Sequence, residues 1–245
     1  MPTAIEEAVA TQRRYYSETA AKYERMHAHE SAGDGFNWKF IAAMLKIADV
    51  QSVLDVGTAT GYRVHEIRST FPEAFVCGIE PVDALLGIAR RNDVLASGSL
   101  IRGSGLALPF ANESFDAVCE FAVLHHVPDP HTVVKEMLRV ARKAVVLSDC
   151  NRFGQGRLLA RLAKLVMYKT RTWRWFDLLR THGTGYRVTD GDGVSYSYSV
   201  YDSFDLLSGW ADRVIVIPSE NGKARSWLNP LLTCPGAVAI ALKGV

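Results

Sequence analysis

The sequence predicts an α/β protein built on a doubly wound, mostly parallel sheet. Two observations carry this prediction. Short runs rich in β-branched residues recur along the chain, at 52–57, 74–80, 99–103, 115–121 and 143–149. The segments between the early runs, 65–71 and 83–92, have apolar residues at helical spacing. Buried strands that alternate with helices form parallel βαβ units with helices on both faces of the sheet.

The chain on either side of these units has a different pattern. Residues 4–29 and 38–48 precede the first strand and show helical spacing. After Cys150 a basic helical stretch with tryptophans is followed by period-two alternation at 194–201, and strands resume only at 213–219 and 236–244. We therefore expect one domain over residues 1–245, with residues 151–201 inserted as a cap that packs on the core.

Composition limits the class of protein. The chain has 245 residues, 48% hydrophobic and 22% charged, which excludes disorder, collagen and coiled coil, and its net charge is only +2. The four cysteines have no C-x-x-C spacing and are expected to be buried thiols in a reducing, cytoplasmic setting: Cys77, Cys119, Cys150 and Cys234. The N-terminus has no basic region, and no apolar stretch approaches the roughly 20 residues of a spanning helix, so we expect neither signal peptide nor membrane span.

A strand that runs directly into a glycine-bracketed turn is the most informative segment. Residues 53–61 read VLDVGTATG. Gly57 allows the backbone to turn close to a ligand, and Gly61 lets the next helix start against the strand. A dinucleotide fingerprint would place glycine where this sequence has Ala59 and Tyr62. The turn therefore favours a nucleotide ligand without a pyrophosphate.

Two acidic residues accompany this turn. Glu80 ends the second strand, 23 positions after Gly57, where a carboxylate can accept both hydroxyl hydrogens of a ribose. The alternative is that Glu80 caps the helix that begins near Val82. Asp55 is either a plain strand-end acid or a partner for the turn's backbone N–H groups or a ligand ammonium.

Residues 12–150 resemble the class I S-adenosylmethionine-dependent methyltransferases. The resemblance rests on four segments: DVGTATG (55–61), GIEP (78–81), RGSGLALPF (102–110) and VLHHVPD (123–129). It implies the seven-stranded, mostly parallel Rossmann-like sheet of that family, S-adenosylmethionine as cofactor, and an N-terminal helical lid over residues 1–48.

The resemblance also implies which residues line the cofactor. They are Tyr15 and Tyr23 in the lid, Asp55, Gly57, Thr58 and Gly61 on the methionine and ribose side, Glu80 at the ribose, Ser104, Gly105 and Leu106 at the adenine, and Glu120 and Phe121 at the methionine end. Many members carry aspartate at the position of Ser104, so adenine binding here falls to the Ser104 hydroxyl or to nearby backbone. Glu120 could instead contact substrate or serve packing.

His125 and His126 are the candidate catalytic bases. A neutral histidine suits removal of a proton from an acceptor hydroxyl or ammonium, because its pKa lies near neutrality. Since successive residues do not share one face, we expect one ring to reach the substrate and the other to pack. The alternative is that neither is catalytic and that the enzyme only positions its reactants.

Other chemistry finds little support. Asp149 and Asn151 follow the fifth strand, where they can bind substrate or a divalent metal, but no third ligand at matching spacing accompanies them and we expect no metal. The motifs of serine hydrolases, P-loop kinases and zinc proteases are absent from the sequence.

The cap is strongly basic. Nine basic residues lie between Arg152 and Arg187, opposed only by Asp177, and apolar residues share one helical face from Leu158 to Val166. This pattern suits peripheral membrane contact through residues 157–176, or binding of an anionic acceptor by Asp149, Asn151, Arg152, Tyr196 and Tyr198. The alternative is a helix that packs its apolar face on the core and leaves its basic face in solvent.

We therefore expect a methyltransferase that acts on oxygen or nitrogen of a small molecule, anionic, glycan or lipid-linked. No RNA-binding appendage and no Asn/Asp-Pro-Pro-Tyr motif is present in the sequence, so we expect no nucleic-acid partner. A non-catalytic cofactor-binding or partner subunit with the same fold is the alternative, and the sequence leaves the oligomeric state open.

Overall fold

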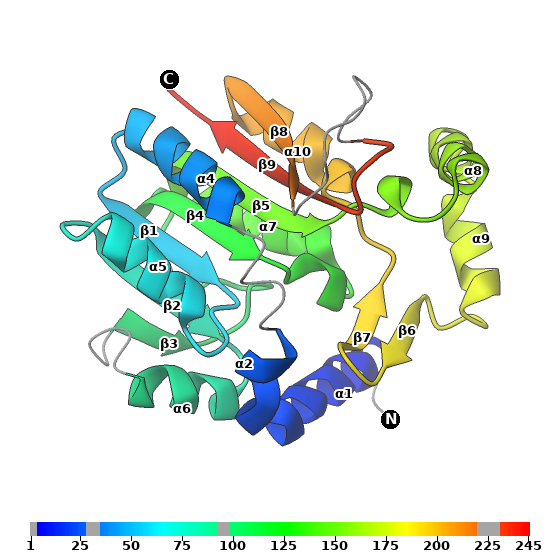
Figure 1. Ribbon diagram of the computed structural model, residues 1–245, viewed down its shortest axis with the longest axis horizontal. Coiled ribbons are helices and arrows are strands. Elements are labelled where there is room, and N and C mark those ends of the chain that lie inside the picture. The colour runs from blue at the N-terminus through cyan, green and yellow to red at the C-terminus, as the bar shows by residue number, and fades with distance from the viewer. Residues whose placement is uncertain (1–3, 28–34, 93–98, 220–230) are drawn as a thin grey trace.

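The computed structural model describes residues 4–27, 35–92, 99–219 and 231–245. A seven-stranded sheet runs through its centre (Figure 1). The strands are β1 (Ser52–Val56), β2 (Phe75–Glu80), β3 (Leu100–Arg102), β4 (Phe115–Phe121), β5 (Ala141–Cys150), β8 (Arg213–Ser219) and β9 (Gly236–Leu242). Their order is β3-β2-β1-β4-β5-β9-β8, with β1 to β5 parallel and β9 antiparallel to both neighbours. The predicted doubly wound, mostly parallel α/β sheet is confirmed.

Helices cover both faces of this sheet. They are α4 (Gly35–Ile47), α5 (Tyr62–Thr70), α6 (Asp83–Arg91), α7 (Pro130–Val140) and α10 (Phe204–Trp210). Successive strand residues point to opposite faces, so Val53 packs in the core cluster with α4 and α5, and Leu54 packs in the cluster with α7 and α10. A strand buried on both faces needs a continuous apolar run, which is why β1 could be located from the sequence.

The N-terminal lid is shorter than expected. It consists of α1 (Ala4–Thr19), η1 (Ala20–Lys22) and α2 (Tyr23–Met26). By contrast, α4 buries Trp38, Ile41 and Leu45 in the core cluster of the sheet. The expectation that residues 1–48 form a lid is therefore wrong for α4, which belongs to the helical layer.

The cap is built from η4 (Arg152–Gly154), α8 (Leu158–Lys169), α9 (Trp173–Arg180), β6 (Tyr186–Thr189), β7 (Gly193–Tyr196) and η5 (Val200–Ser203). β6 and β7 form a separate antiparallel hairpin. The period-two alternation expected over 194–201 is a strand only as far as Tyr196. Figure 1 shows α1 beside β7 and shows α8 and α9 at the outer edge of the molecule.

All four cysteines are free thiols, and only Cys150 is partly exposed. Within the described ranges, no helix combines the length and the apolar character that crossing a bilayer requires.

Candidate active site

Gly57 occupies a position that only glycine tolerates. Its φ is +80°, and a Cβ there would lie 2.4 Å from Cγ2 of Val123. The N–H groups of Gly57 and Thr58 donate to the carbonyl of Ile79 at 2.8 and 3.1 Å. The turn is thus fixed at the carboxyl end of β1, between β2 and β4, where the strand order reverses and open α/β sheets bind their ligands.

Glu80 places a buried carboxylate at the end of β2. Its two oxygens accept hydrogen bonds from the N–H groups of Ala59 at 3.0 Å and Val82 at 2.8 Å. Burial raises the pKa of Glu80 to about 7, although these two bonds oppose the shift. Each carboxylate oxygen retains acceptor capacity. A vicinal diol, which donates two hydrogen bonds, therefore fits this wall, and Glu80 also braces the turn into α6.

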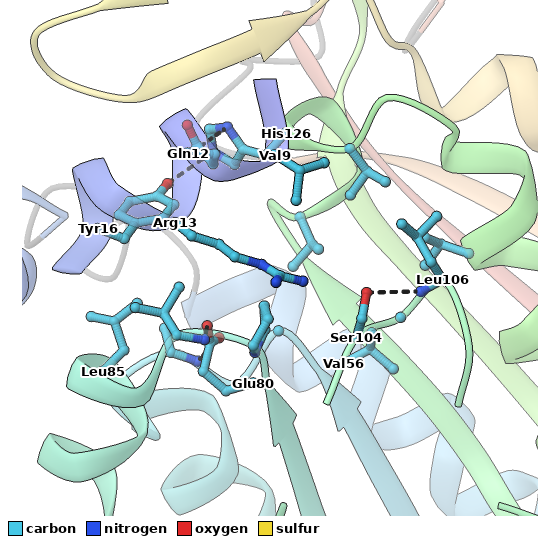
Figure 2. Close-up of a pocket in the computed structure, with 18 of the residues that line it drawn as sticks. Val9, Gln12, Arg13, Tyr16, Val56, Glu80, Leu85, Ser104, Leu106 and His126 are labelled. Atoms are coloured by element: carbon cyan, nitrogen blue, oxygen red, sulfur yellow. Dashed lines mark hydrogen bonds between the residues drawn. The ribbon is translucent and has the colours of Figure 1, made fainter. Parts of the chain in front are cut away.

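A first cavity lies between the lid helix α1 and the carboxyl ends of β1 and β2 (Figure 2). Arg13 and Tyr16 border it from the lid, and the Arg13 side chain extends across it between Glu80 and Ser104. On the opposite wall, Ser104 Oγ accepts from the N–H of Leu106 at 3.3 Å. The Ser104 hydroxyl hydrogen can still donate to an adenine nitrogen.

A second cavity adjoins the first and shares Tyr23, Gly57 and Phe121 with it. Its wall includes Asp55, Thr58, Arg63, His125 and Asp149. The Arg63 guanidinium lies 4.3 Å from the centre of the Phe121 ring. Burial raises the pKa of Asp55 to about 6, partly offset by Thr58 and Arg63. The two cavities form one crevice along the carboxyl ends of the parallel strands.

Asp149, near the end of β5, organises the loop that follows β4. Its Oδ2 accepts from the backbone N–H groups of Leu124 at 2.8 Å and His125 at 3.3 Å, at the start of η3 (Leu124–His126). Its Oδ1 lies 2.8 Å from Nδ1 of His125. Burial alone would lower the pKa of His125, but Asp149 and Asp192 raise it well above its ordinary value. His125 and Asp149 are therefore a hydrogen-bonded pair in which the neighbouring carboxylates favour the protonated ring.

Both histidines converge on Asp192, in the turn between β6 and β7. Their ring centroids are 4.0 Å apart, and Asp192 carboxylate oxygens lie 3.5 Å from His125 Nε2 and 3.2 Å from His126 Nε2. His126 also contacts the Val194 carbonyl at 2.6 Å and the Tyr16 hydroxyl at 3.0 Å. Both rings face the hairpin from the short 3-10 turn, but only His125 also lines the second and third cavities, whereas His126 is bonded to Tyr16 and Gln12 of the lid.

A third cavity lies beneath the cap and meets the second at His125 and Cys150, which line both. Its other lining residues include Arg152, Lys164, Trp173, Arg180, Tyr186, Arg187, Tyr196 and Tyr198. Burial and the neighbouring arginines, Arg180 first among them, lower the pKa of Lys164. The basic character predicted for the cap is thus concentrated on a cavity next to the His125–Asp149 pair.

Arg152 is the most buried cation of this cavity. It pairs with Asp202 and donates to the Ser197 carbonyl. Its Nε has no hydrogen-bond partner among the described residues. Phe153, Tyr168 and Trp173 surround its guanidinium at 5.1 to 5.5 Å.

Most of the predicted site residues line these cavities. On the cofactor side they are Tyr23, Asp55, Gly57, Thr58, Glu80, Ser104, Gly105, Leu106 and Phe121, together with His125 and His126. On the acceptor side they are Asp149, Arg152, Tyr196 and Tyr198. The Tyr198 hydroxyl is buried and hydrogen-bonded to Ser203 at 2.8 Å, so Tyr198 contributes the edge of its ring, and not its hydroxyl, to the cavity wall.

Two predicted polar contacts serve the fold instead. Glu120 is fully buried, and its oxygens accept from the N–H groups of Val123 and Ser148. Asn151 is fully buried too, and its amide donates to the carbonyls of two residues near β9, Leu231 and Cys234. Neither side chain lines a cavity of the crevice, so the expected cofactor role of Glu120 and substrate role of Asn151 are wrong.

Two further predicted contacts are indirect. The Tyr15 hydroxyl donates to the carbonyl of Asp190 at 2.6 Å, so Tyr15 docks the lid on the cap hairpin and not on the cofactor. Gly61, with φ +87°, shapes the start of α5 without lining the crevice.

Sequence reasoning missed Gln12 and Asp192. Gln12 Nε2 lies 3.1 Å from His126 Nδ1 and donates to the Asp192 carbonyl at 3.2 Å, and its Oε1 accepts from the N–H of Val194. The available signal was weak: a polar residue on a lid helix, and an aspartate in the glycine-flanked turn GDG at 191–193. Such a sequence is typical of an ordinary β-hairpin turn and does not by itself indicate a functional residue.

Among the described residues, two groups bring three metal-type ligands within 4.8 Å: His125, His126 and Asp192, and His125, Asp149 and Cys150. The N–O separations between their histidines and carboxylates run from 2.8 to 3.5 Å, so these side chains contact one another directly. No ligand spacing in the sequence indicates the first group, because Asp192 comes from the cap.

Comparison with known proteins places this arrangement in context. The fold is similar to a magnesium protoporphyrin IX methyltransferase from Synechocystis PCC 6803, with TM-score 0.60 and 16% identity over 94% of this chain and 97% of that one. It is also similar to a SAM-dependent methyltransferase from Thermotoga maritima, with TM-score 0.58 and 16% identity over 95% and 99%. Residues 54–148 match the family model of a methyltransferase domain. Residues 54–148 are therefore a methyltransferase domain by sequence, and the rest of the chain shares the fold of these methyltransferases.

Relatives of this methyltransferase domain match only part of the chain. An uncharacterized methyltransferase from Mycobacterium leprae is 38% identical over 100 residues, which are 39% of this chain and 36% of that protein. A demethylmenaquinone methyltransferase from Roseiflexus sp. is 31% identical over 134 residues, 53% of this chain and 55% of that protein. The chain thus spans about a third to a half of these relatives. The Synechocystis enzyme has been crystallised with bound SAM and with bound SAH.

Proposed function

We propose that this protein transfers a methyl group from S-adenosylmethionine to oxygen or nitrogen of a small anionic acceptor. One observation carries the proposal. The crevice along the strand ends and the basic cavity beneath the cap meet at His125, which lines both. A group-transfer enzyme needs such a junction, because cofactor and acceptor must meet at one reacting position.

The crevice residues fit the cofactor. Glu80 would hold the ribose hydroxyls, and Ser104 with Gly105 would border the adenine. Asp55 and Arg63 offer a carboxylate and a guanidinium to the ammonium and carboxylate of the methionine part. When bound, S-adenosylmethionine supplies an electrophilic methyl group on a sulfonium. The lid residue Tyr16 closes the crevice and limits the access of water.

His125 is the base in this proposal. Asp149 binds its Nδ1, so the neutral ring carries its proton there and presents Nε2 as the acceptor. Nε2 takes the proton from the acceptor hydroxyl or ammonium, and Asp149 stabilises the imidazolium that forms. His126 borders only the first cavity and is bonded to the lid, so it positions α1 and Asp192.

The lining of the cap cavity supports an anionic acceptor. Lys164 and Arg187 add to the buried Arg152, and aromatic side chains lie among them. Guanidinium groups bind phosphate and carboxylate with paired hydrogen bonds, and tyrosine and tryptophan stack on rings. A phosphate or carboxylate carried by a glycan or a lipid-linked precursor suits this lining.

Turnover tests the proposal. The purified protein is incubated with S-adenosylmethionine and fractions of anionic metabolites, and products are detected by the mass of one added methylene unit. We expect a product with the wild-type chain and at most a trace with His125→Ala, which should still bind cofactor in calorimetry. Cofactor binding without product in any fraction would favour a non-catalytic subunit.

Acceptor charge is tested separately. Arg187 is exposed and lines the cap cavity, whereas Arg91 is exposed on α6, outside the three cavities described above. Arg187→Glu should weaken acceptor binding and leave cofactor binding unchanged, and Arg91→Glu should change neither. Equal effects of the two variants, or an acceptor affinity that is independent of salt, would contradict an anionic acceptor.

A further inference from the structure

Helices α8 and α9 expose their large apolar side chains. The exposed residues are Leu158, Leu159, Leu162, Val166, Trp175, Phe176 and Leu179. Leu159 is 82% exposed, Leu179 79% and Trp175 69%. α8 has no buried residue at all. Single exposed apolar residues are ordinary, but seven on two consecutive helices mark a surface that is covered in use.

The orientation of α8 is the reverse of that in an ordinary surface helix. Leu158, Leu162 and Val166 are spaced four residues apart and therefore share the outward face. The inward side is held by cations. Arg161 donates to the Leu232 carbonyl at 2.8 Å, and Lys164 donates to the Arg152 carbonyl at 2.9 Å. The reading of α8 as a helix with its apolar face on the core is therefore wrong.

The rim of this surface is positively charged. Arg157, Lys169, Arg171 and Arg174 are all exposed. The only acidic residue from 157 to 180 is Asp177, which is buried and paired with Arg180. Apolar side chains with tryptophan, flanked by arginine and lysine and free of exposed carboxylates, are the composition of a helix that lies in a membrane interface.

We propose that α8 and α9 bind the surface of a bilayer that contains anionic lipids. The apolar residues would enter the boundary between headgroups and acyl chains, and the four cations would contact lipid phosphates. A second copy of this chain fits the surface less well. A twofold contact would set the same patch of four cations against itself, and like charges brought together in an interface are unfavourable.

Vesicle co-sedimentation tests this proposal with the full chain. The probes are vesicles of phosphatidylcholine alone and of phosphatidylcholine with phosphatidylglycerol. Wild type should bind the anionic vesicles at least tenfold more tightly than the neutral ones, and added salt should weaken that binding. Leu159→Glu should weaken binding to the anionic vesicles at least tenfold. The matched control is Ile47→Glu, because Ile47 is 60% exposed on α4, on the body of the domain.

A second variant separates the charge contribution. Lys169→Gln with Arg174→Gln should remove most of the preference for anionic vesicles while the thermal midpoint stays near that of wild type. No binding of the wild type, or equal losses in Leu159→Glu and Ile47→Glu, would overturn the proposal. So would a dimer in light scattering that Leu159→Glu dissociates. Cofactor affinity should be unchanged in every variant, so the outcome is independent of the proposed methyl transfer.

Discussion

Substitution of Gly57 by alanine should destabilise the protein through two separable effects. The φ of +80° would be left-handed for alanine, at a cost of about 1–2 kcal/mol. The new Cβ would lie 2.4 Å from Cγ2 of Val123, and such overpacking costs about 1–3 kcal/mol. Alanine also lowers the conformational entropy of the unfolded chain, which stabilises the folded state by about 0.4–1 kcal/mol and offsets part of these costs. The expected loss of unfolding free energy is therefore about 1–5 kcal/mol.

Urea unfolding of a small set of variants separates the two effects. Gly183 has φ +87° and no atom within 4 Å of a built Cβ, so Gly183→Ala measures the backbone contribution alone. Val123→Ala removes the clashing methyl and should restore about 1–3 kcal/mol in the Gly57→Ala background. The reasoning is refuted if Gly57→Ala costs no more than Gly183→Ala, or if the Gly57 and Val123 changes are additive.

Four further outcomes test the active site. Glu80→Ala should weaken cofactor binding at least tenfold in calorimetry, because two charge-assisted hydrogen bonds to the ribose are worth about 1–3 kcal/mol; unchanged affinity would remove Glu80 from the site. His125→Ala should lower kcat by roughly 10² to 10⁴ with near-normal cofactor affinity, whereas His126→Ala should mainly weaken the packing of the lid on the cap. Full activity in both variants would mean that the enzyme works only by positioning its reactants. Because only the neutral His125 ring accepts a proton, kcat should increase as pH rises through the raised pKa of His125. Asp192→Asn removes a charge that raises this pKa, so it should shift the increase to lower pH. An unshifted pH profile would contradict this coupling. A chelator should leave turnover unchanged, because His125 itself accepts the proton in the proposed reaction, and recovery of lost turnover with zinc would show a metal site instead.

The sequence predicted the parts of the site that depend on local chain geometry. The turn after β1 needs glycine because of a backbone angle, and Glu80 ends a strand whose neighbour is fixed by the βαβ connection. Both requirements can be read from residues close together in the chain. The same holds for the strands, since a run buried on both faces must be apolar throughout.

Contacts between distant segments could not be predicted in this way. Asp192 meets His125 and His126 only because the β6–β7 hairpin folds back over the end of β4. β6 itself was missed because it is a largely exposed four-residue strand whose only partner is β7. Periodicity likewise predicts that α8 has an apolar face but not which way that face points. Its orientation depends on carbonyls near η4 and β9 that bind Arg161 and Lys164.

The lid and the cap meet around His126, and this has a consequence for how the two halves of the site form. A Cβ on Gly193 would lie 2.4 Å from Oε1 of Gln12 and 2.8 Å from Cδ1 of Tyr15, so α1 packs directly on the hairpin backbone. The same hairpin carries Asp192, which faces His125 across the acceptor side. Because α1 also covers the cavity that Glu80 lines, closing the lid over the cofactor and placing Asp192 beside the base depend on one set of contacts. Binding free energy from the cofactor can therefore stabilise the arrangement that the acceptor requires.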